Sequence, residues 1–235
     1  MAEGSDLRLP TLEPVARPTV ADQVFAQLRQ SILSLTLEPG ARISEVEVAA
    51  QLGVSRQPVR DAFYRLSKLG LLEIRPQRST TVTLISETAV MQARFVRVAL
   101  EVETVRAAAQ RMTRLEVAAL DALLREQKRA VDADDRATFH ALDDRFHHDL
   151  CAYAGVGFAW DLINEMKSHM DRVRMLSLSF ASQAAWEDHM AIFEALKRGD
   201  ADGAADAMRA HLWRIREQIE RIRAANHDWF AKDEG

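Results

Sequence analysis

Apolar residues recur with the period of an α-helix, almost without interruption, between residues 86 and 225. Strand signals are missing from this stretch. The pattern breaks mainly at four clusters of Gly, Ser or Asp, near residues 132–135, 155–157, 177–182 and 199–202. Because short breaks between amphipathic helices favour antiparallel neighbours, we predict an all-helical antiparallel bundle of about six or seven helices.

The residues before this bundle follow a different pattern. Residues 1–18 hold three prolines and no apolar repeat, so we interpret them as a flexible tail. Three helices and two short strands are then expected, at residues 20–33, 44–52, 55–69, 71–75 and 80–84. The second and third helices are separated only by the turn Gly53-Val54-Ser55. Two helices joined by a tight turn that contains Gly are the sequence form of a helix-turn-helix.

Charge is distributed unevenly along the chain. The net charge of −4 at first argues against a nucleic-acid partner, because phosphate binding needs clustered Lys and Arg. Residues 53–78, however, contain six Lys or Arg against two Asp or Glu, so the helix-turn-helix region is locally basic. The rest of the chain is correspondingly acidic.

Several features bound the compartment of the protein. The only cysteine, Cys151, permits no intrachain disulfide, which favours a reducing cytoplasm. Residues 1–18 contain no apolar run of signal-peptide length, and no uncharged stretch approaches the ~20 apolar residues of a membrane span. We therefore expect a cytoplasmic protein that is neither exported nor embedded in a membrane.

The start of the third helix carries long polar side chains. In a helix-turn-helix the N-terminal residues of the second helix of the motif enter the major groove. Here they are Ser55, Arg56, Gln57 and Arg60. Arg can bind guanine at two acceptors and Gln can do the same for adenine, so this group suits base reading. An ordinary surface helix with Arg residues is an equally weighted alternative on these four residues alone.

An Asp and three His occupy inward-facing positions of the predicted bundle. At ~100° per residue, Asp143 and His147 lie at the edge of the apolar stripe of their helix, one turn apart. His189 and His211 lie among apolar residues of two further helices. Any one of these histidines is more often a hydrogen-bonded core residue, but together the four favour a site for a divalent ion such as Zn, Ni or Mn. His169 shares another apolar face, and we expect it to line a pocket rather than bind the ion.

The N-terminal region resembles the GntR family of bacterial regulators. Residues 28–33, 38–40, 52–62 and 65–71 carry the resemblance, with Val54-Ser55-Arg56-Gln57-Pro58-Val59-Arg60 as its most specific part. It implies a winged helix-turn-helix whose recognition helix starts at Ser55 and whose wing is the loop around residues 77–80. Arg78, in that wing, is expected to contact DNA, and a repressor is expected.

Residues 88–222 resemble the FadR-type, or FCD, effector domain of the same family. The resemblance rests on residues 97–101, 143–150, 199–200 and 211–212. It implies that Asp143, His147, His189 and His211 bind one divalent cation and that a small organic acid completes its coordination. Arg97 or Arg174 could pair with the carboxylate of this effector. For Arg97, an ion pair with Glu101 at i+4 is an equal alternative.

The predicted architecture is mainly α: a flexible tail (1–18), a winged helix-turn-helix (19–85) and an all-α domain for effector binding and dimerisation (86–230). We expect a homodimer on an inverted-repeat operator of double-stranded DNA, because one recognition helix covers only a few base pairs. A metal-dependent hydrolase is less favoured, since no separate general base or oxyanion donor stands out. A DNA-binding dimer that senses nothing would not need an inward-facing Asp and three His. The effector and the operator sequence do not follow from the residues.

Overall fold

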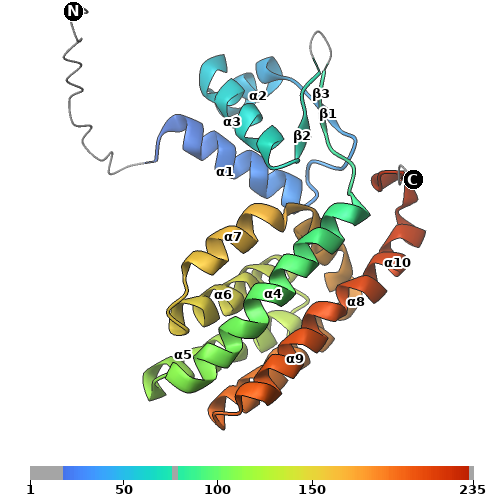
Figure 1. The fold of residues 1–235 in the computed structure, drawn as a ribbon. Helices are drawn as coiled ribbons and strands as arrows, with labels where there is room; N and C mark the ends of the chain where they lie inside the picture. Colours follow the sequence, from blue (N-terminus) through green and yellow to red (C-terminus); the bar gives the residue numbers. More distant parts are fainter. Residues whose placement is uncertain (1–17, 76–78, 233–235) are drawn as a thin grey trace, which may run out of the picture.

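The protein consists of a small N-terminal domain with three helices and a three-stranded sheet, and a larger helical bundle (Figure 1). The computed structural model describes residues 18–75 and 79–232. The N-terminal elements are α1 (Val20–Leu33), β1 (Arg42–Ile43), α2 (Glu45–Leu52), α3 (Arg56–Lys68), β2 (Leu72–Glu73) and β3 (Thr80–Val82). The bundle contains α4 (Glu87–Arg111), α5 (Arg114–Asp132), α6 (Arg136–Tyr153), α7 (Phe158–Met166), α8 (Ser168–Lys197), α9 (Ala201–Trp213) and α10 (Ile215–Ala225), followed by a 3-10 helix, η1 (His227–Trp229).

The helix-turn-helix forms at the residues predicted from its turn, with α2 ending at Leu52 and α3 beginning at Arg56. Ser44 caps α2 by accepting the backbone N–H of Glu47, and Gly53 ends the helix in the left-handed conformation at φ +64°. Ser55 takes the N-cap position of α3, but its side chain makes no capping hydrogen bond. The apolar face of α3 is buried against α1 and α2, so its first, polar turn is left on the surface.

The sheet differs in part from the predicted strand pair. Both predicted strands exist but are shorter, and a third, β1, pairs with β3 to give the antiparallel order β1-β3-β2. The sequence analysis missed β1 because two residues carry no alternation, and the strand exists only through its pairing with β3.

The bundle has the predicted all-helical form, with seven α-helices among its described residues. The break expected at residues 177–182 is wrong: α8 runs unbroken through it, and the Ser177 hydroxyl donates to the Arg174 carbonyl oxygen within the helix. A break that was missed separates α4 from α5, where Thr113 and Glu116 form a capping box.

The linker between the two domains, residues 83–86, is held by the helical domain. The buried Arg172 of α8 donates to the Thr83 carbonyl oxygen at 2.6 Å. Beyond α10, the Trp229 carbonyl accepts the Ile85 N–H at 2.8 Å, and Ala231 N–H donates to the Ile85 carbonyl at 2.9 Å. A movement of α8 or of the C-terminal segment would therefore displace the linker, and with it the base of the DNA-binding domain.

Candidate metal centre and DNA-reading helix

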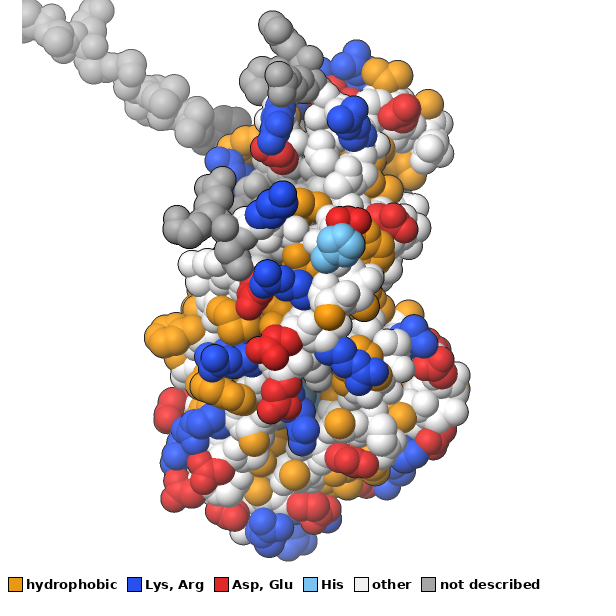
Figure 2. Space-filling model, turned by 90° about the vertical axis from the view of Figure 1, so that its right-hand side faces the viewer, with side chains coloured by type: hydrophobic (Ala, Val, Ile, Leu, Met, Phe, Trp, Pro, Cys, Tyr) orange, Lys and Arg blue, Asp and Glu red, His pale blue; other side chains and the backbone are white. Residues whose placement is uncertain are grey.

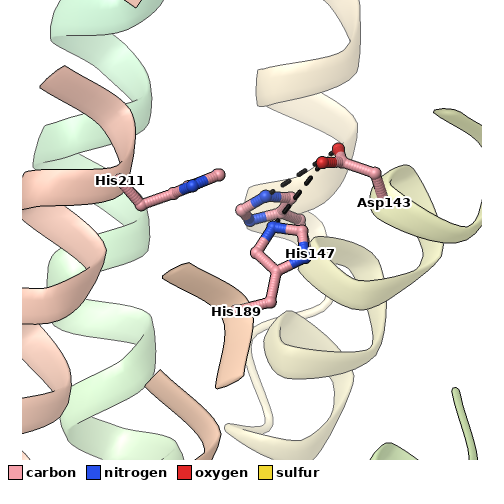
Figure 3. A group of neighbouring side chains, drawn as sticks. All are labelled: Asp143, His147, His189 and His211. Carbon is pink, nitrogen blue, oxygen red and sulfur yellow. Dashed lines mark ion pairs between the residues drawn. The ribbon is translucent and has the colours of Figure 1, made fainter. Parts of the chain in front are cut away.

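Four side chains converge inside the bundle (Figure 3). Asp143 and His147 lie one turn apart on α6, His189 comes from α8 and His211 from α9. Each offers one ligand atom, and these atoms all lie within 4.8 Å of one another. The apolar residues Phe139, Phe146 and Leu150 turn the same side of α6 inward, which carries Asp143 and His147 into the interior. The structure thus brings together all four residues proposed as metal ligands.

Each imidazole has an oxygen acceptor beside its Nδ1 atom. His147 Nδ1 lies 2.5 Å from Glu101 Oε2, and His189 Nδ1 lies 2.9 Å from Gln127 Oε1. His211 Nδ1 is 3.4 Å from Asp188 Oδ2. The Gln127 and Asp188 oxygens are hydrogen-bond partners of Nδ1 in His189 and His211, which would keep the proton there and leave the lone pair on Nε2, as is usual in histidine ligands of metals. The Glu101 oxygen lies close to His147 Nδ1 without the geometry of a hydrogen bond.

The sequence analysis did not assign these three acceptors to the site. They lie on α4, α5 and α8, each on a different helix from the imidazole that it faces. Glu101 was considered only as a partner of Arg97. Only the packing of the helices reveals that all three residues lie beside the imidazoles.

The electrostatics of the cluster suit metal ligation. Burial lowers the pKa of both His189 and His211, so these imidazoles are neutral at pH 7 and their lone pairs are available. Burial alone would raise the pKa of Asp143, but the charge of Arg174 outweighs it and holds the pKa well below its usual value. Three imidazoles and one carboxylate are the donor set of a borderline divalent ion.

The buried nitrogens of the cluster that lack a hydrogen-bond partner are also available to bind a cation. The Nε2 atoms of His147 and His189 are buried and have no hydrogen-bond partner among the described residues. They lie 4.0 Å and 3.5 Å from the Asp143 carboxylate oxygens. Buried polar atoms without a partner are costly, and a shared divalent ion would satisfy both nitrogens and the carboxylate together.

A small cavity of about 40 Å³ lies beside the cluster. Its lining includes His211 of the cluster, Arg97, Arg174 and Arg214, and apolar residues of α8 and α10. Since one water needs roughly 10–15 Å³, the cavity has room for a few waters. An organic acid with several carbon atoms would therefore have to displace the surrounding helices or side chains.

The two arginines considered for the effector line this cavity but already have acidic partners. Arg97 donates to Glu101 at 2.5 Å and 3.3 Å, and both side chains are buried. This is the alternative that the sequence left open for Arg97. Arg174 forms an ion pair with Asp143 and lies 4.0 Å from Asp144, so its charge borders both the cluster and the cavity.

His169, which was expected to line a pocket, is not part of the cavity beside the cluster. Its Nδ1 accepts the Ser86 N–H at 3.2 Å and faces Arg172 Nη2 at 2.7 Å, at the domain linker. Burial and the nearby Arg172 lower its pKa to about 4, so it is a neutral acceptor there. The apolar stripe that suggested a pocket is divided between two helices, because Leu162 and Met166 are exposed on α7 while Val173 is buried in α8.

The proposed DNA-reading residues lie at the N-terminal end of α3. Ser55, Gln57, Arg56 and Arg60 are all exposed, and the two arginine side chains each keep 58% of their accessible surface. Both arginines donate to Glu45 at the start of α2. Gln77 and Arg78 of the proposed wing loop lie outside the described residues.

Within residues 18–75 and 79–232, no helix is long and apolar enough to cross a membrane. Figure 2 shows one face of the molecule, on which basic, acidic and hydrophobic side chains are interspersed. This face is therefore neither an extended apolar surface nor a surface of one charge sign.

Comparisons with known proteins cover both domains. The description "Bacterial regulatory proteins, gntR family" matches residues 20–82, and "FCD domain" matches residues 92–214. Over 227 residues the chain is 38% identical to the HTH-type transcriptional repressor RspR of Escherichia coli (strain K12), covering 95% of this chain and 100% of that protein. It is 32% identical to the probable D-xylose utilization operon transcriptional repressor of Paenarthrobacter nicotinovorans, covering 86% of this chain and 89% of that one.

Solved structures share the fold. The structure of E. coli McbR/YncC matches with a TM-score of 0.74 at 22% identity, over 88% of this chain and 98% of that chain. A putative transcriptional regulator GntR from Rhodococcus sp. RHA1 matches with a TM-score of 0.67, also at 22% identity, over 87% of this chain and 98% of that chain. The order of a helix-turn-helix domain followed by a helical bundle is therefore shared with known proteins.

Proposed function

Because the chain belongs to the GntR family of bacterial regulatory proteins and has an FCD domain, we propose that it is a repressor whose operator affinity is set by a small organic acid bound at a metal ion. Its relatives along the whole chain are transcriptional regulators, so it is a regulator of transcription rather than a hydrolase. Residues 19–85 would bind DNA, and residues 86–230 would sense the acid and dimerise. The observation that carries the sensing role is the convergence of three imidazoles and one carboxylate in a buried cluster.

Asp143, His147, His189 and His211 would hold one divalent ion, Zn, Ni or Mn. The ion, when bound, would supply an electrophilic anchor for a carboxylate group. Glu101, Gln127 and Asp188 would keep the Nδ1 protons in place, so that the three Nε2 atoms remain aimed at one point. Four protein ligands leave coordination positions open in a six-coordinate ion.

A small carboxylate would enter the cavity beside the cluster. Arg97 and Arg174 both line this cavity and both have acidic partners, and Arg174 would be the better placed to contact an acid at the metal because its partner, Asp143, belongs to the cluster. The cavity has room for only a few waters, so binding of the acid requires the helices around it to adopt another packing. The acid would bind one helix packing more tightly than the other. The ratio of these two affinities limits the change in operator affinity, which is typically about 5- to 150-fold.

Helix α8 provides the physical connection to the DNA-binding domain. Its residues His189 and Arg174 belong to the cluster and its border, while Arg172 on the same helix holds the Thr83 carbonyl in the linker. A shift of α8 caused by the bound acid would therefore be transmitted to the base of β3. In a dimer, that shift would change the spacing of the two recognition helices.

Stoichiometric Zn²⁺ binding, together with an operator affinity that a small carboxylate changes, would support this proposal. A chain that binds operator DNA but no metal would instead support the second candidate, a DNA-binding protein whose bundle only dimerises. If the cluster bound metal but no acid changed the operator affinity, the metal would have only a structural role.

We expect Gln127→Leu to weaken metal binding by about 10- to 100-fold, because His189 loses the acceptor that fixes its proton on Nδ1. Calorimetric titration of Zn²⁺ into chelator-treated protein measures the affinity. Gln183→Leu, an exposed change on α8 that removes only a bond to Glu187, serves as the matched control. Equal affinities of the two variants, both correctly folded by circular dichroism, would show that Gln127 does not support the site.

We propose that the homodimer forms through the outer faces of α4 and α7. Three large apolar residues one turn apart on α7 are exposed: Phe158 (65%), Leu162 (47%) and Met166 (44%). Phe95 on α4, which packs against α7, is 73% exposed. A row of exposed apolar side chains of this kind is typical of an interaction surface.

Leu162→Asp is therefore expected to convert the dimer to a monomer, because it places a charge in the apolar contact. Size-exclusion chromatography with light scattering reads the mass directly. Leu115→Asp, at an 83% exposed position on α5, should leave the dimer intact. Wild-type protein that remains monomeric both free and bound to DNA would contradict the dimer, and a dimeric Leu162→Asp variant would contradict its placement.

A further inference from the structure

We propose that Glu45 is a positioning residue of the DNA-reading surface, which holds Arg56 and Arg60 in the orientation that reads base edges and so sets operator specificity. The inference rests on the proposed function of α3 as the recognition helix. It goes further in assigning a role to an acidic residue on a different helix, α2, at a surface that must approach phosphates.

The contacts that carry the inference join three side chains. Arg60 donates from Nε to Glu45 Oε1 and from Nη2 to Glu45 Oε2, each at 3.2 Å, which is a two-point pairing of guanidinium and carboxylate. Arg56 donates from Nη2 to the same Oε2 at 3.1 Å. One carboxylate therefore holds both arginines, and it is placed by the capped first turn of α2.

Glu45 is charged under the conditions of DNA binding. The hydrogen bond from Arg60 lowers the pKa of its carboxyl group, and the bond from Arg56 acts in the same direction. A carboxylate on a DNA-facing surface repels phosphate, so it weakens binding to any DNA sequence. We infer that this loss of general DNA affinity is compensated by a role of Glu45 in reading DNA.

Orientation is what distinguishes a base contact from a phosphate contact. A phosphate accepts hydrogen bonds from an arginine over a broad range of directions, whereas the O6 and N7 atoms of guanine require a guanidinium in one plane. A guanidinium has five N–H donors. Arg60 gives two of them to Glu45 and Arg56 gives one, so both arginines keep free donors while Glu45 restricts their rotation.

Glu45 thus lowers the affinity for DNA of any sequence and raises the preference for the operator. Without Glu45 the two arginines gain rotational freedom and the surface becomes more positive by one charge. Binding to arbitrary DNA should then strengthen. The preference for operator over other DNA should fall, because mobile arginines bind phosphates as readily as bases.

The test compares the full-length wild-type chain with Glu45→Ala and Glu45→Gln. The operator probe is a duplex selected by the wild-type chain from a random pool, and the reference probe is a scrambled duplex of equal composition. We expect the ratio of the two affinities to fall by about tenfold in Glu45→Ala, within the range that one two-point base contact provides. Glu45→Gln keeps one acceptor oxygen, so its ratio of the two affinities should lie between those of the wild type and Glu45→Ala.

Asp61→Asn is the matched control for charge. Asp61 also lies on α3, 3.8 Å from Arg65, and its change adds the same unit of positive charge without touching Arg56 or Arg60. It should raise both affinities and leave their ratio unchanged. A Glu45→Ala ratio equal to that of Asp61→Asn, with both variants folded, would overturn the role of Glu45. If Arg56→Ala and Arg60→Ala also left operator binding intact, the assignment of α3 itself would be wrong.

Discussion

His189→Ala is expected to lose its bound metal and, with it, every response of operator binding to an organic acid. The His189 side chain is fully buried, its Nε2 atom lies 3.5 Å from Asp143 Oδ1, and its Nδ1 is held by Gln127. Removing a ligand should weaken binding beyond the about 10- to 100-fold loss expected when only an orienting partner is removed. His211→Ala should behave in the same way.

Basal operator binding should survive in both variants, because the arginines that read DNA lie on α3 in the other domain. Elemental analysis of the purified variants and operator titrations by fluorescence anisotropy give the two readouts. His148→Ala is the control on α6, since its side chain is 53% exposed and faces away from the cluster. Because an alanine leaves a hole in the core, His189→Gln and a thermal melt separate loss of ligation from loss of fold.

One metal per chain in both His189→Ala and His211→Ala would remove these histidines from the site. Loss of metal with an unchanged response to an acid would separate sensing from the metal, and would move the effector site away from the cluster.

Arg56→Ala and Arg60→Ala are each expected to weaken operator binding by about 5- to 150-fold, the equivalent of ~1–3 kcal/mol for a lost two-point base contact. Both side chains are exposed at the N-terminal end of α3 and are not among its buried residues. The fold should therefore be unaffected. A titration at fixed salt against the selected operator and a scrambled duplex measures the loss.

A specific role predicts that the loss is larger for the operator than for the scrambled duplex. Arg125→Ala, which removes an exposed arginine of α5 in the other domain, controls for net charge. Operator affinity that stayed at the wild-type value in both α3 variants would show that another element reads the bases. An equal loss for both duplexes would reassign the arginines to phosphate contacts.

The sequence predicted best the features that depend on neighbouring residues. The turn at Gly53, the cap at Ser44 and the buried face of α3 are local, so the helix-turn-helix is predictable from its own residues. The four members of the cluster were found in the same way. Each lies on the buried side of its helix, and helical periodicity is sufficient to indicate that side.

Features that depend on packing between distant segments were missed or wrong. Glu101 and Gln127 face the histidines only after α4 and α5 are packed beside α6 and α8. The false break at residues 177–182 arose because Ser favours turns, while in α8 the serine hydroxyls bond back to carbonyls of their own helix. The stripe that placed His169 in a pocket is divided by the break between α7 and α8, and the His169 side chain faces Ser86 in the domain linker instead.

A single metal ion in the helical domain is central to the proposed function of the protein. Calorimetric titration of Zn²⁺ into the chelator-treated wild-type chain tests it directly, with the His189→Ala chain titrated in parallel. We expect one site per chain in the wild type and no stoichiometric binding in the variant. An absence of stoichiometric binding in the wild type, or the same single site in the variant, would contradict the account.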